Sequence, residues 1–260
     1  MKYKIFQVDA FTENLYGGNP AAVVPLDKWL PDERMQKIAA ENNLAETVFY
    51  VPKENDFHLR WFTPTVEVDL CGHATLATAH VMYTHLGYNK SQINFDSRSG
   101  MLSVQRDGDC FTLDFPADKP ERIETPQVIL DAITVKPVET YKGKNFLLIV
   151  LDSQEQIEEL NPVIEQIKKA HRHGVIFTAK GNEVDFVSRC FFPNSGIDED
   201  PVTGSAHTMS TPYWASKLGK SKLSAQQLSK RKGHLECELV GDRVKISGKA
   251  ITYLMGEIDI

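Results

Sequence analysis

The sequence predicts an α+β fold of two pseudo-symmetric domains, each a β-barrel-like sheet wrapped around a central helix. The first observation is a repeated segment: Asp56-Phe-x-x-Arg-x-Phe-x-Pro recurs from Asp185, an offset of 129 (185 − 56). The second is a Gly-x-Ala turn before a small-residue run, at Gly72 and again at Gly204, 132 apart (204 − 72). Offsets near half of 260 residues indicate two copies of one structural unit.

The repeat predicts an N-terminal half at residues 1–116 and a C-terminal half at residues 128–260. Residues 117–127 are rich in Pro and charged side chains and are expected to be the linker. A chain of this length can bury a large core, as one large domain or as two of about 130 residues. The repeat favours two.

The composition limits which binding partners and which cellular compartment are expected. The net charge of −6 disfavours nucleic acid, because proteins that bind a phosphate backbone usually present a basic face. The chain has no signal-peptide core and no apolar run long enough to cross a membrane, so a cytoplasmic protein without a membrane partner is expected. The four Cys are far apart and form no Cys-x-x-Cys, which disfavours structural zinc.

The local patterns predict the elements of each half in order. The first half has strands at 3–10, 44–51, 57–63 and in a hairpin at 100–115, and helices at 31–43 and 74–86. The second half has strands near 134–141, 145–151, 173–179 and 184–191, an acidic helical stretch near 153–169, and a helix that follows the Gly204 turn and runs to about Leu218. A meander with a turn at Gly241-Asp242 closes the chain.

The two glycine turns are the expected place for chemistry. A turn at the mouth of a helix leaves backbone N–H groups without acceptors, and the helix dipole adds partial positive charge, which together favour an anion. Two such turns related by a repeat are expected to face each other across the cleft between domains and to hold a substrate carboxylate. His73 and Ser205 directly follow Gly72 and Gly204, and Asp200 lies four residues before Gly204.

Each of these residues also has a purely structural explanation. His73 alone would more often be a packing or capping residue, Ser205 a helix cap, and Asp200-Pro201 a turn. The pair Asn19-Pro20 is typical of a tight turn or a helix cap, and Glu46 is typical of an exposed residue at the start of a strand. Only the coincidence of the two turns shifts the balance towards a functional site.

Several ordered motifs resemble the PhzF-like isomerases of phenazine-biosynthesis type, over nearly the whole chain. The motifs are Asp9-Ala-Phe-Thr, Gly18-Asn-Pro-Ala-Ala-Val, Leu44-Ala-Glu-Thr-Val-Phe, Arg60-x-Phe-Thr-Pro, Cys71-Gly-His-Ala-Thr and Glu199-Asp-Pro-Val-Thr-Gly-Ser-Ala-His. The resemblance implies the diaminopimelate-epimerase-like fold, with two pseudo-symmetric domains and the active site between them.

The resemblance also implies a reaction and the residues that perform it. Glu46 would be the general acid/base that removes and returns a proton at a substrate carbon. His73, Asp200 and Ser205 would position the substrate and assist the proton, and Asn19, Gly72 and Gly204 would bind it. The substrate would be a small carboxylate, as in the founding activity on trans-2,3-dihydro-3-hydroxyanthranilate. No metal and no cofactor are implied, and the family's habit is a homodimer.

Four alternatives stay open at this level. A two-thiol racemase or epimerase could use Cys71, but no Cys precedes Gly204, and Cys190 aligns with Trp61. A Ser hydrolase is disfavoured because Ser205 lacks the second Gly of Gly-x-Ser-x-Gly. A metal enzyme would need His171-x-His173, or His73 with His80 and a third ligand. The last alternative is a non-catalytic small-molecule binding protein on the same fold, in which loss of the Glu46 carboxylate would leave binding intact.

Overall fold

The computed structural model describes residues 1–260 and divides into two compact units. Unit 1 comprises Met1–Asp114 together with Ser247–Ile260, and unit 2 comprises Phe115–Ile246. None of the helices combines the length and the apolar character that a membrane crossing requires.

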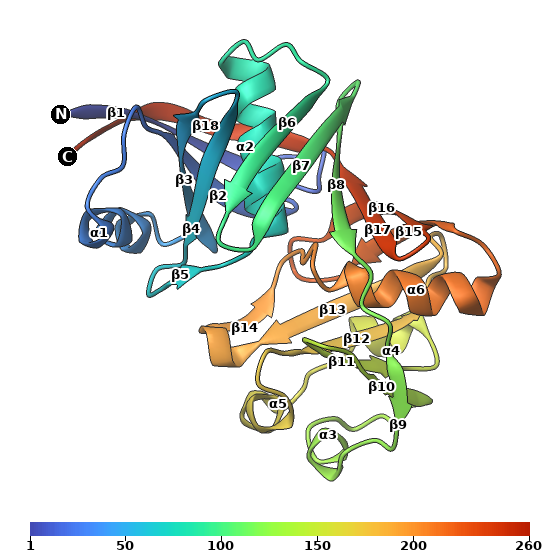
Figure 1. Cartoon of the computed structure of the whole chain (residues 1–260). Coiled ribbons are helices and arrows are strands. Elements are labelled where there is room, and N and C mark those ends of the chain that lie inside the picture. The colour runs from blue at the N-terminus through green and yellow to red at the C-terminus, as the bar shows by residue number, and fades with distance from the viewer. The chain divides into compact units, whose positions relative to one another are not determined.

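Unit 1 contains two helices and nine strands (Figure 1). The helices are α1 (Asp32–Asn42) and α2 (Gly72–His85). The strands are β1 (Lys2–Ala10), β2 (Asn19–Pro25), β3 (Glu46–Lys53), β4 (Asp56–Phe62), β5 (Glu67–Val68), β6 (Gln92–Ser97), β7 (Gly100–Asp107), β8 (Cys110–Pro116) and β18 (Ala250–Asp259).

Unit 2 contains the remaining elements. Its helices are α3 (Gln127–Leu130), α4 (Gln154–Glu158), α5 (Ile164–Ala170), α6 (His207–Leu218) and the short 3-10 helix η1 (Pro193–Ser195). Its strands are β9 (Glu121–Ile123), β10 (Glu139–Lys142), β11 (Leu147–Val150), β12 (Val175–Lys180), β13 (Phe186–Phe192), β14 (Ile197–Asp200), β15 (Lys222–Gln227), β16 (Gly233–Val240) and β17 (Arg243–Gly248).

The internal repeat appears as the same sequence of strand pairings in both units. In unit 1, β2 pairs parallel with β3, β3 antiparallel with β4, β4 antiparallel with β5, and β4 parallel with β6. In unit 2 the same steps join β11 to β12, β12 to β13, β13 to β14, and β13 to β15. The register repeats too, because Phe49 lies opposite Arg60 and Phe177 opposite Arg189. The predicted two-fold repetition is therefore confirmed.

Each unit wraps its strands around a central helix. Every residue of α2 from Gly72 to Tyr83 is buried, and the helix contacts β1, β2, β3, β7 and β18 (Figure 1). A helix that is buried all round needs small residues where the surrounding sheet approaches closely, and Ala74, Ala77 and Ala79 meet that need. In unit 2, α6 contacts β15 and β16, and Trp214 stacks on Phe186 of β13.

The boundaries of the predicted halves differ from the compact units in two ways. The predicted C-terminal half ran to residue 260, but β18 pairs along its length with β1 and completes unit 1. The predicted linker at 117–127 contains β9, which pairs with β10. The sequence pattern missed both because strand pairing joins segments far apart in the chain, which a local pattern does not record.

Two predicted elements also differ in extent. The acidic stretch at 153–169 forms two helices, α4 and α5, because Pro162 lacks an N–H and its preceding residue avoids the helical region. The predicted helix at 31–43 is present as α1, whose Met35, Ile38 and Ala39 pack with Phe49 of β3 in one core cluster.

Candidate active site

The first cluster of polar side chains lies where β2, β3 and α2 begin. Asn19 is the first residue of β2, and Glu46 is the first residue of β3, the parallel neighbour of β2. His73 lies in the first turn of α2, which contacts both strands. Glu46 lies opposite Ala21, two residues after Asn19, so the starts of the two parallel strands lie near the same edge, where the N-terminus of α2 adds its N–H groups. All three side chains are buried.

The contacts centre on the imidazole of His73. Its Nε2 lies 3.0 Å from Glu46 Oε2, and these side chains are only 5% and 12% exposed. On the other side of the ring, Nδ1 lies 3.2 Å from Asn19 Nδ2 and 3.5 Å from Cys71 Sγ. The structure therefore brings together three predicted residues, Asn19, Glu46 and His73, and adds Cys71 to them.

The charges in this cluster favour a protonated His73. Burial alone would lower the pKa of His73, but the neighbouring Cys71 and Glu46 outweigh burial and raise it well above its usual value. Burial raises the pKa of the Cys71 thiol to about 11, helped by the Glu46 charge. Since Cys71 is then an uncharged thiol near neutral pH, Glu46 supplies the negative charge that stabilises the imidazolium.

The same cluster has a donor set that could hold a metal ion. Ligand atoms of Glu46, Cys71 and His73 all lie within 4.8 Å of one another, and thiolate, imidazole and carboxylate are the ligands that zinc accepts in proteins. Cys71 Sγ and Glu46 lie on opposite nitrogens of the His73 ring, so the observed arrangement suits proton exchange along the ring.

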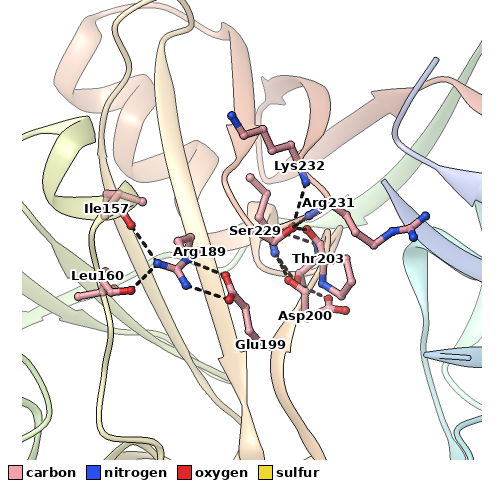
Figure 2. A network of polar contacts seen from close by, with 11 residues as sticks. Ile157, Leu160, Arg189, Glu199, Asp200, Thr203, Ser229, Arg231 and Lys232 are labelled. Carbon is pink, nitrogen blue, oxygen red and sulfur yellow. Dashed lines mark hydrogen bonds and ion pairs between the residues drawn. The ribbon is translucent and has the colours of Figure 1, made fainter. Parts of the chain in front are cut away.

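The second cluster lies in unit 2, in the turn between β14 and α6 (Figure 2). Asp200 ends β14 and is buried, and its carboxylate accepts a short hydrogen bond from the hydroxyl of Thr203. The carbonyl of Thr203 accepts a hydrogen bond from Nδ1 of His207, 2.8 Å away, in the first turn of α6. Burial lowers the pKa of His207 to about 4, so this ring is neutral near pH 7.

The helix that the sequence predicts after the Gly204 turn is present as α6, which begins at His207. Gly204, Ser205 and Ala206 form a tight turn, whose carbonyls accept from the N–H groups of His207, Thr208 and Met209 at 3.0, 3.1 and 3.2 Å. The N–H groups of the three turn residues themselves donate no backbone hydrogen bond. The turn thus keeps three consecutive donors available at the helix mouth, as a longer helix would.

A repeated ion pair anchors the strand before each turn. Arg189 holds Glu199 with two hydrogen bonds of 2.6 and 2.9 Å, next to Asp200 (Figure 2). Arg60 holds Glu67 in the same way, with two bonds of 2.7 Å. A planar guanidinium that meets a carboxylate at two points fixes direction as well as distance. The repeated Arg therefore fixes the short strand that leads into each turn.

The structure places the predicted residues in two separate sets. Asn19, Glu46, Gly72 and His73 gather in unit 1, and Asp200, Gly204 and Ser205 follow one another in unit 2. The prediction that the two sets act on one substrate stays a prediction.

Two residues near the second turn, Thr203 and Gln227, were not singled out by the sequence patterns, and a third, Cys190, lies where it was expected. Thr203 corresponds to Cys71 in the repeat, and this correspondence was the signal that could have singled it out. Gln227, which bonds Thr203, carries no motif and lies on a distant strand. Cys190 lies in β13, the strand before the second turn, and pairs with Asp200 as Trp61 pairs with Val68, so its predicted alignment with Trp61 is confirmed. It is fully buried, and burial and the Asp200 charge raise its pKa well above the usual value, so it is no accessible thiolate.

Of the histidines in the metal-enzyme alternative, His171, His173 and His80 lie outside the cluster around His73. Nδ1 of His171 accepts from the N–H groups of His173 and Gly174, at 3.2 and 3.4 Å, and so stabilises a turn. Nε2 of His80 lies 2.9 Å from the hydroxyl of Thr252. Neither arrangement gathers three metal ligands.

Comparison with known proteins gives one consistent answer. The family model for phenazine biosynthesis-like proteins (PhzC–PhzF) matches residues 8–256. An uncharacterised isomerase of Pseudomonas aeruginosa is 52% identical over 260 residues, covering 100% of both chains. A crystal structure of a PhzF-family protein from Enterococcus faecalis is 46% identical, with a TM-score of 0.97 over 100% of both chains.

A more distant structure shares the fold alone. A hydroxyproline epimerase from Agrobacterium vitis is 10% identical, with a TM-score of 0.63 over 99% of this chain and 92% of its own. The predicted epimerase-like fold is confirmed by this likeness and by the closer relatives.

Proposed function

Because the chain belongs to the phenazine biosynthesis-like (PhzC–PhzF) family, we propose that it is an isomerase that moves a proton between carbons of a small carboxylate substrate. Glu46 is the general acid/base in this proposal, and the reaction resembles that of trans-2,3-dihydro-3-hydroxyanthranilate isomerase. Relatives that are named isomerases support the general part of this proposal, that the protein is an isomerase.

The observation that carries the proposal is the buried contact between Glu46 Oε2 and His73 Nε2 at 3.0 Å. A carboxylate that takes a proton from carbon must return it to another carbon without losing it to water, and burial restricts that loss. As an imidazolium, His73 forms an ion pair with Glu46 and stabilises the charge that the carboxylate carries before and after each transfer. Glu46 and His73 thus form one proton-handling pair.

Asn19 suits both protonation states of His73. With Nδ2 towards the ring, as in the structure, the amide donates to an unprotonated Nδ1 at 3.2 Å. Rotation of the amide would present its oxygen, which accepts from a protonated Nδ1, since amide oxygen and nitrogen occupy equivalent places. Cys71 Sγ, at 3.5 Å, is a second acceptor for that proton. We assign Asn19 the task of keeping the His73 ring oriented while its charge changes.

The second set of residues is assigned to substrate recognition. The N–H groups of Gly204, Ser205 and Ala206 suit a carboxylate, or the anion that forms when a proton leaves the neighbouring carbon. Asp200 suits an amino or hydroxyl group of the substrate. That this set serves the same substrate as Glu46 is part of the proposal and rests on the resemblance to the family.

The direct test is exchange of substrate hydrogen with solvent. The wild-type protein is incubated in D2O with a panel of small cyclic and amino-acid carboxylates that includes trans-2,3-dihydro-3-hydroxyanthranilate, and the products are followed by proton NMR. We expect deuterium at one carbon of at least one compound. Compounds that bind without incorporating deuterium would favour the non-catalytic binding protein instead.

A further inference from the structure

The turn that carries Asp200 is held by a side chain with no assigned role, the amide of Gln227. This residue ends β15 and is fully buried. Its Oε1 accepts from the N–H of Thr203 at 2.8 Å, and its Nε2 donates to the carbonyl of Asp200 at 2.7 Å. Nε2 also lies 3.3 Å from the hydroxyl oxygen of Thr203.

These contacts fix the direction of every hydrogen bond in the turn. The backbone N–H of Thr203 is only a donor and the carbonyl of Asp200 is only an acceptor, so the Gln227 amide has one allowed orientation. Because Nε2 donates to the Thr203 oxygen, the single hydroxyl proton of Thr203 points to Asp200 Oδ2, as the short contact between them requires. Gln227 therefore orients the Asp200 carboxylate through Thr203.

The repeat shows that this device is specific to the second turn. In the parallel pair β13–β15, Phe186 lies opposite Ala225, and in β4–β6, Phe57 lies opposite Phe95. Two residues further along, Gln227 corresponds to Ser97, the last residue of β6. The Ser97 hydroxyl donates to the carbonyl of Gly100, 2.7 Å away in the next strand, and not to the Gly72 turn. A requirement common to both halves would have placed the same contact in both.

A second contact ties the same turn to the hairpin after β15. Ser229 is buried, donates to the carbonyl of Pro201 at 2.8 Å, and accepts from the N–H of Lys232 at 3.2 Å (Figure 2). Ser229 bonds only the backbone of the turn. Gln227 is the residue that reaches both its backbone and, through Thr203, the Asp200 carboxylate.

We infer that Gln227 is a positioning residue for the isomerisation, which holds Asp200 and the adjoining Gly204–Ala206 turn in the geometry that the substrate requires. The inference rests on the proposed function, because it assigns Asp200 and the turn to substrate. It adds that a residue outside every recognisable motif controls them.

The test compares Gln227→Met with Gln226→Met. Gln226 precedes Gln227 on β15 and is partly exposed, with its amide 3.1 Å from His234 Nε2, so it controls for the substitution itself. Hydrogen exchange of the Thr203 amide is measured by NMR in both variants. We expect exchange to rise about tenfold or more only in Gln227→Met, since a hydrogen bond of about 1.4 kcal/mol is lost. Unchanged Thr203 protection would overturn the inference.

Turnover supplies the second readout, with the carboxylate that shows Glu46-dependent deuterium exchange as substrate. We expect kcat to fall about 100-fold in Gln227→Met, as a misplacement near 1 Å produces, and to be unchanged in Gln226→Met. Loss of Thr203 protection with unchanged turnover would also overturn the inference. If no compound exchanges, the proposed function fails, whereas the amide measurement still decides whether Gln227 holds the turn.

Gln227→Glu separates positioning from loss of packing. The introduced carboxyl keeps the acceptor for Thr203 N–H but, when ionised, has no proton to donate to Asp200 O or Thr203 Oγ. Its turnover relative to wild type should rise as the pH falls and the carboxyl gains a proton, while the ratio for Gln227→Met stays constant. If turnover relative to wild type had the same pH profile in Gln227→Glu and Gln227→Met, a role for the N–H donor of Gln227 would be contradicted.

Discussion

At the residue scale, the pairing of Glu46 with His73 determines what the first cluster can do. The sequence identified both residues through their motifs, and the structure places their side chains 3.0 Å apart. It did not identify Cys71 as the neighbour of His73 Nδ1, because a thiol two residues away faces the ring only when the helix begins between them, at Gly72.

The charge state of His73 leads to a prediction about pH. The pKa of His73 is raised well above 6.5, against burial, by Cys71 and Glu46. A raised folded-state pKa means that the stabilisation from the imidazolium is fully present below the unfolded-state pKa of about 6.5 and is lost as the pH rises through the folded-state value. NMR titration should therefore show that His73 of the wild type stays protonated well above pH 6.5. In Glu46→Gln, His73 should lose its proton at a lower pH than in the wild type.

His207 is the internal control for that titration. It is buried as His73 is, but no carboxylate contacts its ring, and its pKa is lowered to about 4. Its titration should not change in Glu46→Gln. A His73 pKa that is equal in the two proteins would show that Glu46 does not stabilise the imidazolium.

At the scale of the element, the turn into β2 fixes where Asn19 lies. Gly18 has φ +59°, and a Cβ added there would lie 2.1 Å from the carbonyl oxygen of Ala10. The Gly18-Asn-Pro motif predicted a turn at this place. The contact that makes glycine obligatory comes from β1, the neighbouring strand, and could not be predicted from the motif.

Gly18→Ala should consequently destabilise the protein more than an ordinary substitution at positive φ. Gly87 is the matched control, since it has φ +71° and an added Cβ meets nothing within 4 Å. We expect Gly87→Ala to lower the free energy of unfolding by about 1 kcal/mol, and Gly18→Ala by at least about 2 kcal/mol more. Urea unfolding of the two variants measures the difference, and equal losses would show that the close approach to Ala10 is relieved without cost.

At the scale of the whole molecule, the sequence predicted the repeat, but it did not predict that the C-terminal strand belongs to the first unit. The recurring Asp-Phe-x-x-Arg segment marked the two copies because β4 and β13 occupy equivalent places in the two units, with equivalent pairing partners and the same register. The last strand, β18, follows unit 2 in the chain but belongs to unit 1. Its pattern predicts a strand and contains nothing that specifies β1 as its partner.

Deletion of residues 250–260 should thus destabilise unit 1, although most of that unit lies at the other end of the chain. β18 pairs with β1 from Lys2 to Ala10, so its loss exposes the N–H and C=O groups of that strand. Hydrogen exchange measured by mass spectrometry should become roughly 100-fold faster or more in β1 and β2, which corresponds to about 3 kcal/mol of local stability. The amides of β12 and β13 should keep their protection. Faster exchange there and unchanged exchange in β1 would refute the assignment of β18 to unit 1.

The most direct measurement of the central claim is solvent-deuterium exchange with wild type, Glu46→Gln and the control Glu54→Gln. Glu54 is exposed in the turn that follows β3 and retains no contact with the cluster. Since a positioned general acid/base contributes about 10² to 10⁴-fold, exchange into the active carboxylate should fall by that factor in Glu46→Gln and remain unchanged in Glu54→Gln. Deuterium exchange that persists in Glu46→Gln would contradict the assignment of Glu46 as the base. If exchange were lost in Cys71→Ser instead, the Cys71 thiol would be the group that transfers the proton.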